Sequence, residues 1–542
     1  MKQRTHACLV SMTGKKIGAT LLLCWRLVSL CAGKLKGDPS PDAMGLHKSY
    51  LGSTSLTNFS YSSRVQLHVL QPSVSRVTFF IFIMVGSWTT AAAVGLLALT
   101  NASPLQKRAP MFDYNNQKVR GVNTGGWFVL EPWITPSMFE GNSAKDEYTL
   151  VAAIGKDQAQ SKLQNHWNSW ITQDDFNQMA AAGLNHVRIP IGYWSVLPRE
   201  GDPYLQGAYE KLGEALDWAS GAGLKVMIDL HGAPESQNGF DNSGKYGSVG
   251  WTQGDSVAYT IKVLNKIRDD HASHPAVSAI ELLNEPLGPN LDMNTVRQFY
   301  MDGWGNLKDS NVAITFHDAF QGVTSWGNWG AGMWNLLLDT HHYEIFDPSA
   351  VAMSIDDHVK TACDFGNQMA STGKWTVAGE WTGGITDCAK WLNGKDKGAR
   401  YDGTFSGSSK VGDCTGKYTG SVANLSSADK YNIGRFIEAQ LDAYEKATGW
   451  IFWTWKTEGA PEWDMQDLLA NGIFPQPLTA RKCKYSLWCC MSMKLTTSRP
   501  RPVWLSTSLF MRRLLGAFLL FLLPPHTRSV STPILYTRPV TM

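Results

Sequence analysis

The fold of this 542-residue chain is decided by the stretch AVSAIELLNEP, residues 276–286. Its apolar run is typical of a buried strand, and Asn284, Glu285 and Pro286 end the run with an amide, an acid and a rigid turn. A second acid, Glu380, closes another apolar run that begins at Lys374. Two acids that follow buried strands suggest hydrolysis of a sugar bond, because that chemistry uses a pair of carboxyl groups.

Between about residues 115 and 475, short apolar runs alternate with longer amphipathic stretches. Eight of the runs are predicted to be strands: Val119–Gly125, His186–Ile191, Lys225–Leu230, Val277–Leu283, Val312–His317, Leu337–His342, Lys374–Glu380 and Trp450–Trp455. Helices are predicted between several of them, at Asp174–Ala182, Tyr209–Ala222, Ala258–Asp270 and Ala428–Lys446. This alternation predicts an α/β fold, a (β/α)8 TIM barrel that forms a single catalytic domain, rather than a doubly wound open sheet.

Composition and charge exclude several function classes. Hydrophobic residues make up 43% of the chain and charged residues 18%, which indicates a sizeable core. The net charge of +3 is too small to favour a nucleic acid or an anionic membrane surface as the partner. The chain has no Gly-rich phosphate loop and no Gly-x-Ser-x-Gly turn, so nucleotide chemistry and serine hydrolysis are poorly supported. Of the 22 tryptophans, we expect most to pack in the core and some to stack on sugar rings.

In a (β/α)8 barrel the chemistry takes place at the carboxyl ends of the strands. Polar and aromatic residues gather at the predicted ends: Arg188, His231, Asn284, Glu285, His317, His341, Tyr343, Glu380, Trp453 and Trp455. The acids could instead cap loops, and Arg188 could form a structural salt bridge. The functional alternative for Arg188 is to keep a nucleophilic carboxylate ionised. Three histidines could suggest zinc, but no His-Glu-x-x-His helix supports it, so no metal is predicted.

Longer motifs carry a resemblance to a known family. They are RGVNTGGWFVLEPW (120–133), VRIP (187–190), DLHGAP (229–234), LNEP (283–286), HHY (341–343), GEW (379–381) and GWIFWTWKTE (449–458). In this order and spacing, over about 109–482, the chain resembles the fungal exo-β-1,3-glucanases of glycoside hydrolase family 5. Each motif alone is a weak signal, and together they are highly specific.

The resemblance implies that Glu285 is the general acid/base and Glu380 the nucleophile of a retaining hydrolase. It implies a glucose subsite lined by Arg188, His231, Asn284, His341, Tyr343 and a tryptophan, for which we favour Trp453 over Trp455 on the same strand face. Glu131 would bind the hydroxyls of the non-reducing end, and Phe240 and Asp241 would contact the next sugar. The resemblance implies no metal and no organic cofactor. We also expect the pKa of Glu285 to be raised, because a general acid must begin protonated.

These residues predict an enzyme that releases glucose from the non-reducing end of β-1,3-glucan by double displacement, in fungal cell-wall metabolism. An endo-β-glucanase and a glucan transglycosylase on the same site remain open, as does a non-catalytic glucan-binding wall protein. The expected partner is a β-1,3-glucan polysaccharide or oligosaccharide. We expect no nucleic acid partner, no stable membrane insertion and a monomer.

The two ends of the chain differ from its middle. Residues 1–83 and 483–542 show no clean periodicity, and we interpret both as disordered extensions produced by the gene model. Residues 84–108 resemble a secretory signal and propeptide, with an apolar core and then the dibasic pair Lys107-Arg108. The barrel is therefore expected over 109–482, in a secreted protein of the extracellular space or cell wall.

Cysteines in the middle of an exported chain are expected to form disulfides. We predict that Cys388 pairs with Cys414, and that Cys363 pairs with a cysteine near the C-terminus.

Overall fold

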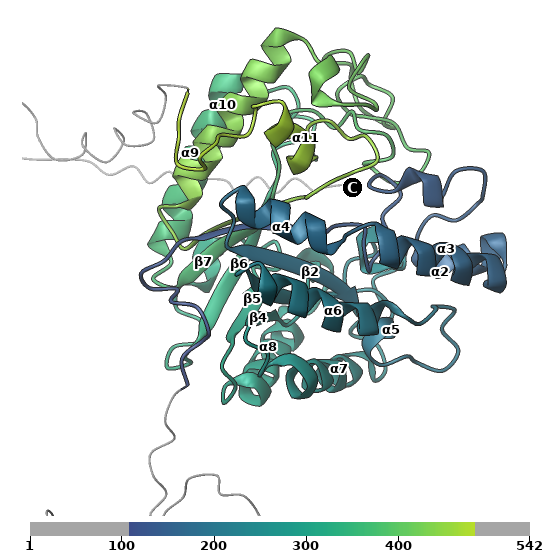
Figure 1. Ribbon diagram of the computed structural model, residues 1–542, viewed down its shortest axis with the longest axis vertical. Coiled ribbons are helices and arrows are strands. Elements are labelled where there is room, and N and C mark those ends of the chain that lie inside the picture. The colour runs from purple at the N-terminus through teal and green to yellow at the C-terminus, as the bar shows by residue number, and fades with distance from the viewer. Residues whose placement is uncertain (1–107, 483–542) are drawn as a thin grey trace, which may run out of the picture. The chain divides into compact units, whose positions relative to one another are not determined.

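A computed structural model describes residues 108–482, and these form a closed barrel of parallel strands (Figure 1). The strands follow one another around the barrel in chain order, and β1 pairs with β8 to close it. Their bounds are β1 Val119–Asn123, β2 His186–Gly192, β3 Lys225–Gly232, β4 Val277–Glu281, β5 Ala313–His317, β6 Leu336–His342, β7 Trp375–Trp381 and β8 Gly449–Phe452. All eight predicted strands are confirmed, with small differences at their ends, and so is the (β/α)8 fold.

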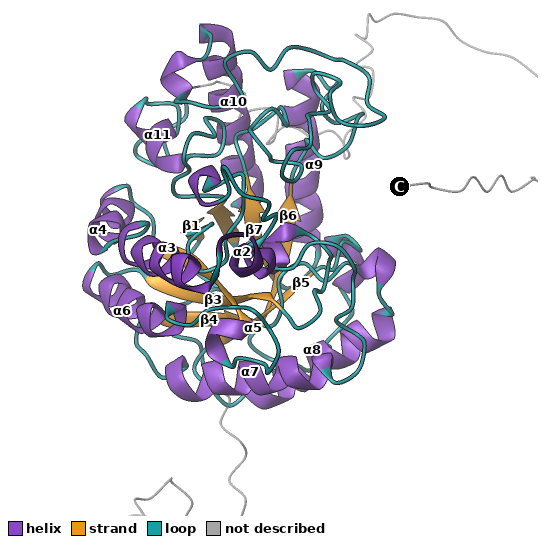
Figure 2. Cartoon of the chain, turned by 90° about the vertical axis from the view of Figure 1, so that its right-hand side faces the viewer, coloured by secondary structure: helices purple, strands orange, loops and turns teal. Residues whose placement is uncertain are grey.

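Helices surround the strands (Figure 2). They are α2 Glu147–Ile154, α3 Lys156–Ser169, α4 Gln173–Ala181, α5 Tyr193–Val196, α6 Ala208–Gly221, α7 Ser256–His271, α8 Met293–Leu307, α9 Ile355–Ser371, α10 Ser427–Tyr444 and α11 Met465–Ala470, with short 3-10 turns at Pro136–Met138, Asp241–Ser243, Gly288–Asn290, Val323–Trp326 and Val422–Asn424. Several helices begin at a residue whose side chain accepts a hydrogen bond from the first turn, among them Thr172 before α4 and Ser426 before α10. The four predicted helices are confirmed as α4, α6, α7 and α10.

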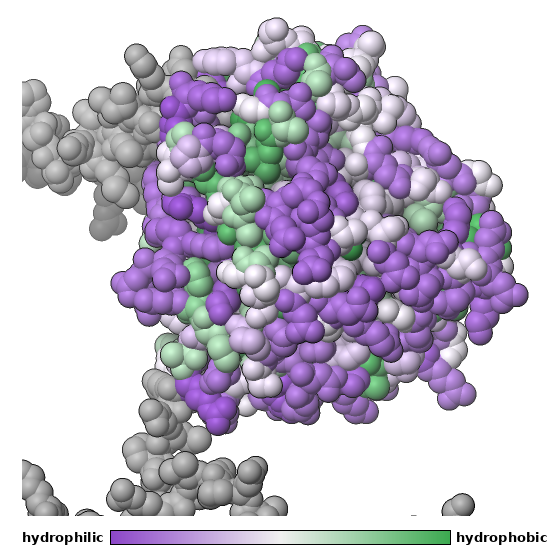
Figure 3. Space-filling view, in the orientation of Figure 1, coloured by the Kyte–Doolittle hydropathy of each residue, from purple (hydrophilic) through white to green (hydrophobic). Residues whose placement is uncertain are grey.

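One face of the molecule can be followed in the space-filling view. The face seen in Figure 3 is largely hydrophilic, with apolar side chains in smaller patches. Within residues 108–482, no helix has the length and apolar character needed to cross a membrane.

The interior of the barrel is apolar at the amino ends of the strands and carries acidic side chains further toward their carboxyl ends. A buried apolar cluster joins Phe112 and Tyr114, which precede β1, to residues from every strand except β2 and including Met227, Ala279 and Leu337. Two residues further along the same strands lie the fully buried acids Asp229, Glu281 and Asp339. Side chains alternate across a strand, so these acids face the same interior as the apolar layer. Buried acids of this kind are stabilised by a cation beside them or by taking up a proton.

An irregularity in β7 sets the direction of Glu380. The register between β6 and β7 shifts between Thr340 and His341. At Gly379, a Cβ atom would meet the carboxylate oxygens of Asp339 at 2.1 and 2.2 Å, and the Gly379 N–H donates to that carboxylate (2.7 Å). Glycine is required there because Asp339 fills the space of a side chain. The bulge lets the next residue, Glu380, also turn toward the interior.

The long loop of residues 382–421, between β7 and α10, carries the predicted Cys388–Cys414 disulfide, which is confirmed. The predictions for residues 1–83, for the signal segment before residue 108 and for 483–542 concern residues outside the described part of the chain. The same holds for the expected C-terminal partner of Cys363.

Candidate active site

Arg188 of β2 is the cation that lies beside the buried acids. Its side chain is fully buried and donates to Glu281 Oε2 (Nε, 2.8 Å) and Glu380 Oε1 (Nη1, 3.0 Å). Its Nη2 lies 3.1 Å from Asp229 Oδ2 and donates to Asn284 Oδ1 (2.8 Å). The prediction placed Arg188 at a strand end. It lies instead inside the barrel, because β2 continues to Gly192, and it supports the acids from below.

Glu380 is held by three groups that favour its ionised form. Arg188 donates to Oε1, the Tyr343 hydroxyl donates to Oε2 (2.9 Å), and His341 Nδ1 lies 3.4 Å from Oε2. Burial nevertheless raises the pKa of Glu380 above its ordinary value, against the opposing charges of His341 and Arg188. This carboxylate is thus fixed in direction, with 5% of its side chain exposed.

Glu285 stands just beyond β4 in a strained backbone conformation, with φ of +44°. The backbone on either side is fixed, since Asn284 N donates to Leu230 O (3.0 Å) and Leu287 N to Gln237 O (3.0 Å). His341 Nδ1 donates to Glu285 Oε1 (2.7 Å), and Asn242 Nδ2 donates to Oε2 (3.0 Å). The turn therefore aims the carboxylate at His341.

The expected raised pKa of Glu285 is wrong for this structure. Burial raises it, but the hydrogen bond and charge of His341, followed by Asn242, bring the pKa below its ordinary value. The pKa of His341 is itself well above normal, because the charge of Glu380 and the hydrogen bonds to Asp339 and Glu285 outweigh burial. The raised pKa favours the protonated form of His341, whose Nδ1 lies within 2.7 Å of Glu285 Oε1 and 3.4 Å of Glu380 Oε2.

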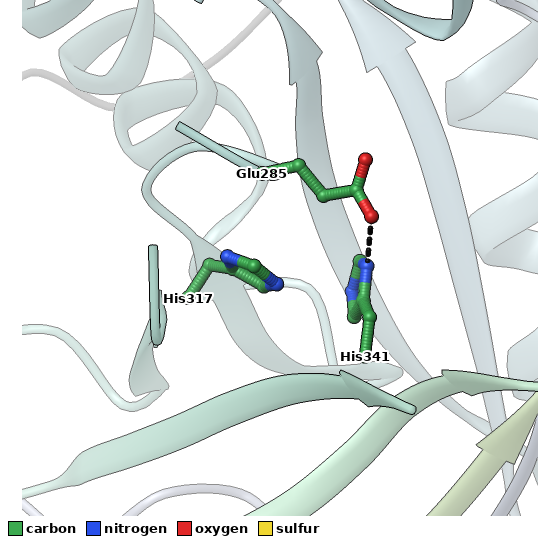
Figure 4. A group of neighbouring side chains, drawn as sticks. All are labelled: Glu285, His317 and His341. Carbon is green, nitrogen blue, oxygen red and sulfur yellow. Dashed lines mark hydrogen bonds and ion pairs between the residues drawn. The ribbon is translucent and has the colours of Figure 1, made fainter. Parts of the chain in front are cut away.

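Glu285, His317 and His341 converge in a way that could suggest a metal site (Figure 4). Each offers one ligand atom within 4.8 Å of the others. However, His317 Nδ1 accepts the backbone N–H of Ala319 (3.0 Å), so the neutral ring carries its proton on Nε2. A metal on Nε2 would move that proton to Nδ1, against the Ala319 N–H. This donor set does not fit a metal ion.

The residues Glu281, Asp339 and His341 form a second such group. Arg188 Nε lies 2.8 Å from Glu281 and 3.9 Å from Asp339, so a guanidinium already supplies the positive charge there. Repulsion by that charge disfavours a metal cation in this group as well.

Three further predicted residues meet beside the carboxylates. His231 Nδ1 lies 2.6 Å from Asp229 Oδ2, and its ring stacks on Trp453 with centroids 5.6 Å apart. Asn284 Nδ2 lies 3.5 Å from His231 Nε2. His231 and Asn284 are both fully buried.

We expected Trp455 to share a strand face with Trp453, and this prediction is wrong. Strand β8 ends at Phe452, and the Trp455 indole donates to Asp175 Oδ1 (2.9 Å) in α4. The chain has left the barrel sheet before residue 455, so Trp455 packs among the outer helices.

Glu131 faces the same space as the carboxyl pair. Its Oε2 accepts from the Trp133 indole (2.9 Å), whereas Oε1 is buried without a partner among the described residues. Burial and the charges of Asp241, Glu380 and Glu285 raise its pKa well above the ordinary value. Burial and the charge of Asp146 raise the pKa of Asp241 to about 7. Phe240, next to it, is 41% exposed, as suits a residue at an entrance.

Several residues of the site were not predicted from the sequence: Asn123, Asp229, Asn242, Glu281 and Asp339. Asn123 orients both sides of the site, because its Oδ1 accepts from Arg188 (3.1 Å) and its Nδ2 donates to Gly379 O (2.8 Å). The three acids carried a usable signal, since an acid inside an apolar strand needs a buried partner. Asn242 lies in a long loop and carried none.

Two cavities of about 500 and 510 Å³ lie at the opposite end of the barrel, where Trp375 and Leu336 begin their strands. Neither contains any of the acids described above. The convergence of charged groups, rather than cavity size, therefore locates the candidate active site.

Comparisons with known proteins agree with this geometry. Residues 151–387 match the family model described as cellulase (glycosyl hydrolase family 5). The chain is 53% identical to a glucan 1,3-beta-glucosidase of Blumeria graminis over 402 residues, which are 72% of this chain and 94% of that protein. It is 52% identical to a probable glucan 1,3-beta-glucosidase A of Aspergillus niger, over 72% of this chain and 96% of that protein.

Among solved structures, the chain is similar to a rutinosidase from Aspergillus niger, with a TM-score of 0.53 and 19% identity. The match covers 67% of this chain and 99% of the rutinosidase, and it supports the barrel fold alone. Together with the two carboxyl groups at the ends of β4 and β7, the matches of sequence decide the family. The chain belongs to glycosyl hydrolase family 5 and is a relative of the fungal glucan 1,3-beta-glucosidases.

Proposed function

We propose that this protein releases glucose from the non-reducing ends of β-1,3-glucan outside the fungal cell, as a retaining hydrolase. The names of its relatives support the substrate, and the paired carboxylates support the chemistry. Action on wall glucan and the signal-like residues 84–108 support secretion.

The observation that carries the mechanism is the sharing of one nitrogen by both acids. Glu285 Oε1 lies 2.7 Å from His341 Nδ1, and Glu380 Oε2 lies 3.4 Å from the same atom. Two oxygens so close to one atom suit the carboxyl separation of about 5–5.5 Å in retaining enzymes, rather than the wider gap of inverting ones.

In the first step, the Glu380 carboxylate bonds to the anomeric carbon while the bond to the leaving oxygen breaks. That oxygen takes a proton from the carboxyl group of Glu285, so the reacting form of the enzyme carries the proton on Glu285 and the negative charge on Glu380. In the second step, water gives a proton to Glu285 and bonds to the anomeric carbon, and the bond to Glu380 breaks. Two inversions give glucose of retained β configuration.

We expect laminarin to yield glucose from the first time point, as the β anomer. Proton NMR of the anomeric signals and chromatography of the products measure this outcome. A ladder of oligosaccharides would instead support an endo-glucanase, and initial α-glucose would exclude double displacement. Longer oligosaccharides from laminaribiose would support transglycosylation, and binding without release would support a non-catalytic wall protein.

Replacing His341 with Gln should move the pH profile of kcat/KM to higher pH on both sides. The cation of His341 lowers the pKa of Glu285 and of Glu380, so its loss raises both. Because Glu380 must be ionised to react, its raised pKa moves the acidic limb to higher pH. Because Glu285 must be protonated to react, its raised pKa moves the alkaline limb to higher pH. Rates on an aryl β-glucoside across the pH range measure this shift.

The control for that profile is His274→Gln, because His274 lies in the turn between α7 and β4 and pairs with Asp217. Its profile should match the wild type. An unmoved profile for His341→Gln would contradict the assigned role of the imidazolium.

A further inference from the structure

Lysines of the long β7–α10 loop tie three loops together. Lys395 Nζ donates to three backbone carbonyls of the β1–α2 loop: Phe139 O (2.8 Å), Asn142 O (2.5 Å) and Ala144 O (3.0 Å). An ammonium group has three donors, so Lys395 gives its whole bonding capacity to one neighbouring loop. Lys390 adds an ion pair with Glu140 of that loop.

The β3–α7 loop joins the same assembly through Tyr246. Lys397 Nζ donates to the Tyr246 hydroxyl (2.8 Å), and the Tyr246 N–H donates to Asp146 Oδ2 (2.6 Å) at the start of α2. We call the contacts of Lys390, Lys395 and Lys397 with these two loops the lysine clamp.

The lysine clamp lies on the Glu131 side of the acids. Glu131 belongs to the β1–α2 loop that Lys395 holds, and its pKa responds to Asp241, Glu380 and Glu285. The pKa of Asp241 in turn is raised by the charge of Asp146, at the start of α2, and lowered by that of Lys397, a residue of the clamp. Glu131 thus interacts electrostatically with the carboxyl pair and with Asp241, and Asp241 interacts with Lys397 of the clamp.

The loop that carries the clamp also shares an apolar cluster with Trp453, whose ring stacks on His231 in the site. Ala389 and the half-buried Trp391, from the same loop as Lys395, pack in one cluster with Trp133 and Trp453. Lys395 Nζ lies 5.4 Å from the centroid of the Trp391 ring. Movement of the loop would therefore also move Trp133 and Trp453.

We propose that Lys395 determines specificity by closing the site on the Glu131 side, so that the enzyme accepts only chain ends. An enzyme that cuts inside a polymer must let sugars extend on both sides of the acids. Loops joined across one side prevent this extension, and release of that junction should permit internal cutting. The inference rests on the proposed function and names the residues that would enforce it.

The test uses Lys395→Met, which keeps the apolar stem and removes all three donors, on two forms of laminarin. Periodate cleaves vicinal diols, and a 3-linked glucose inside the chain has none, so treatment alters the chain ends alone. The wild type should lose at least about 100-fold of its rate on treated laminarin, since terminal contacts position the substrate. Lys395→Met should cut the treated polymer at least tenfold faster than the wild type and release oligosaccharides.

The controls separate specificity from folding. Lys395→Arg keeps donors at this position and should behave as the wild type, and so should Lys410→Met, an exposed lysine of the same loop. If Lys395→Met does not fold, Lys397→Met, which removes the exposed bond to Tyr246, should give a smaller increase on treated laminarin.

The outcomes are distinct. Equal wild-type rates on treated and untreated laminarin would overturn the proposed function. A wild type that requires intact ends, together with folded Lys395→Met and Lys397→Met that require them equally, would overturn the role of the clamp alone.

Discussion

Replacing Glu380 with Gln is expected to abolish glucan hydrolysis while leaving the fold intact. The amide keeps the size of the carboxylate and can still accept from Arg188, but it cannot bond to the anomeric carbon. Loss of a catalytic nucleophile lowers kcat on the order of 10⁴-fold or more. Initial rates on laminarin, with thermal unfolding of the same samples, measure the effect.

Comparison with Glu285→Gln assigns the two roles. A dinitrophenyl β-glucoside has a leaving group that needs no proton, so its first step should proceed in Glu285→Gln and fail in Glu380→Gln. A 2-deoxy-2-fluoro glucoside should add one sugar to the wild-type peptide that contains Glu380. Glu210→Gln, an exposed residue of α6, is the matched control for the change of charge. Turnover of laminarin by Glu380→Gln near the wild-type rate would refute the assignment.

Replacing Arg188 with Met is expected to cause the largest loss of stability. The side chain is fully buried among Asp229, Glu281 and Glu380, and its removal leaves their charges without a cation. Breaking a buried pair by removing one partner costs about 3–5 kcal/mol in the free energy of unfolding. Activity should fall as well, since Glu380 loses the donor to Oε1 and its pKa rises further.

Arg188→Lys should recover part of the stability and little of the activity. A lysine keeps the charge but lacks the planar fork that reaches Glu281, Glu380 and Asn284 together. The matched control is Arg120→Met, because Arg120 of β1 pairs with Glu445 at 2.7 Å with 28% of its side chain exposed. That change should cost about 1 kcal/mol or less. Denaturant unfolding that gave equal losses for Arg188→Met and Arg120→Met would contradict the central role of Arg188.

The direction and ionisation of the two carboxyl groups depend on the residues that surround them. Arg188 holds Glu380 from below, Asp339 holds His341 from the side, and the bulge at Gly379 turns Glu380 inward. The protonation of the pair is set by His341, so the same carboxyl types receive different pKa values from their neighbours. The raised pKa expected of Glu285 from its role as general acid is not found, because His341 and Asn242 lower it.

The amino-acid sequence by itself determined the eight strands, four of the helices, the Cys388–Cys414 pair and the family, because apolar periodicity and local motifs carry that information. It also placed Glu285 and Glu380 at strand ends. Only the tertiary structure decided that Arg188 lies beneath the acids and that Trp455 leaves the sheet. Only the structure likewise shows that Asn242 donates to Glu285 and that Lys395 donates to the β1–α2 loop. These contacts join residues far apart in the chain, and their energies depend on burial and distance, which no local pattern records.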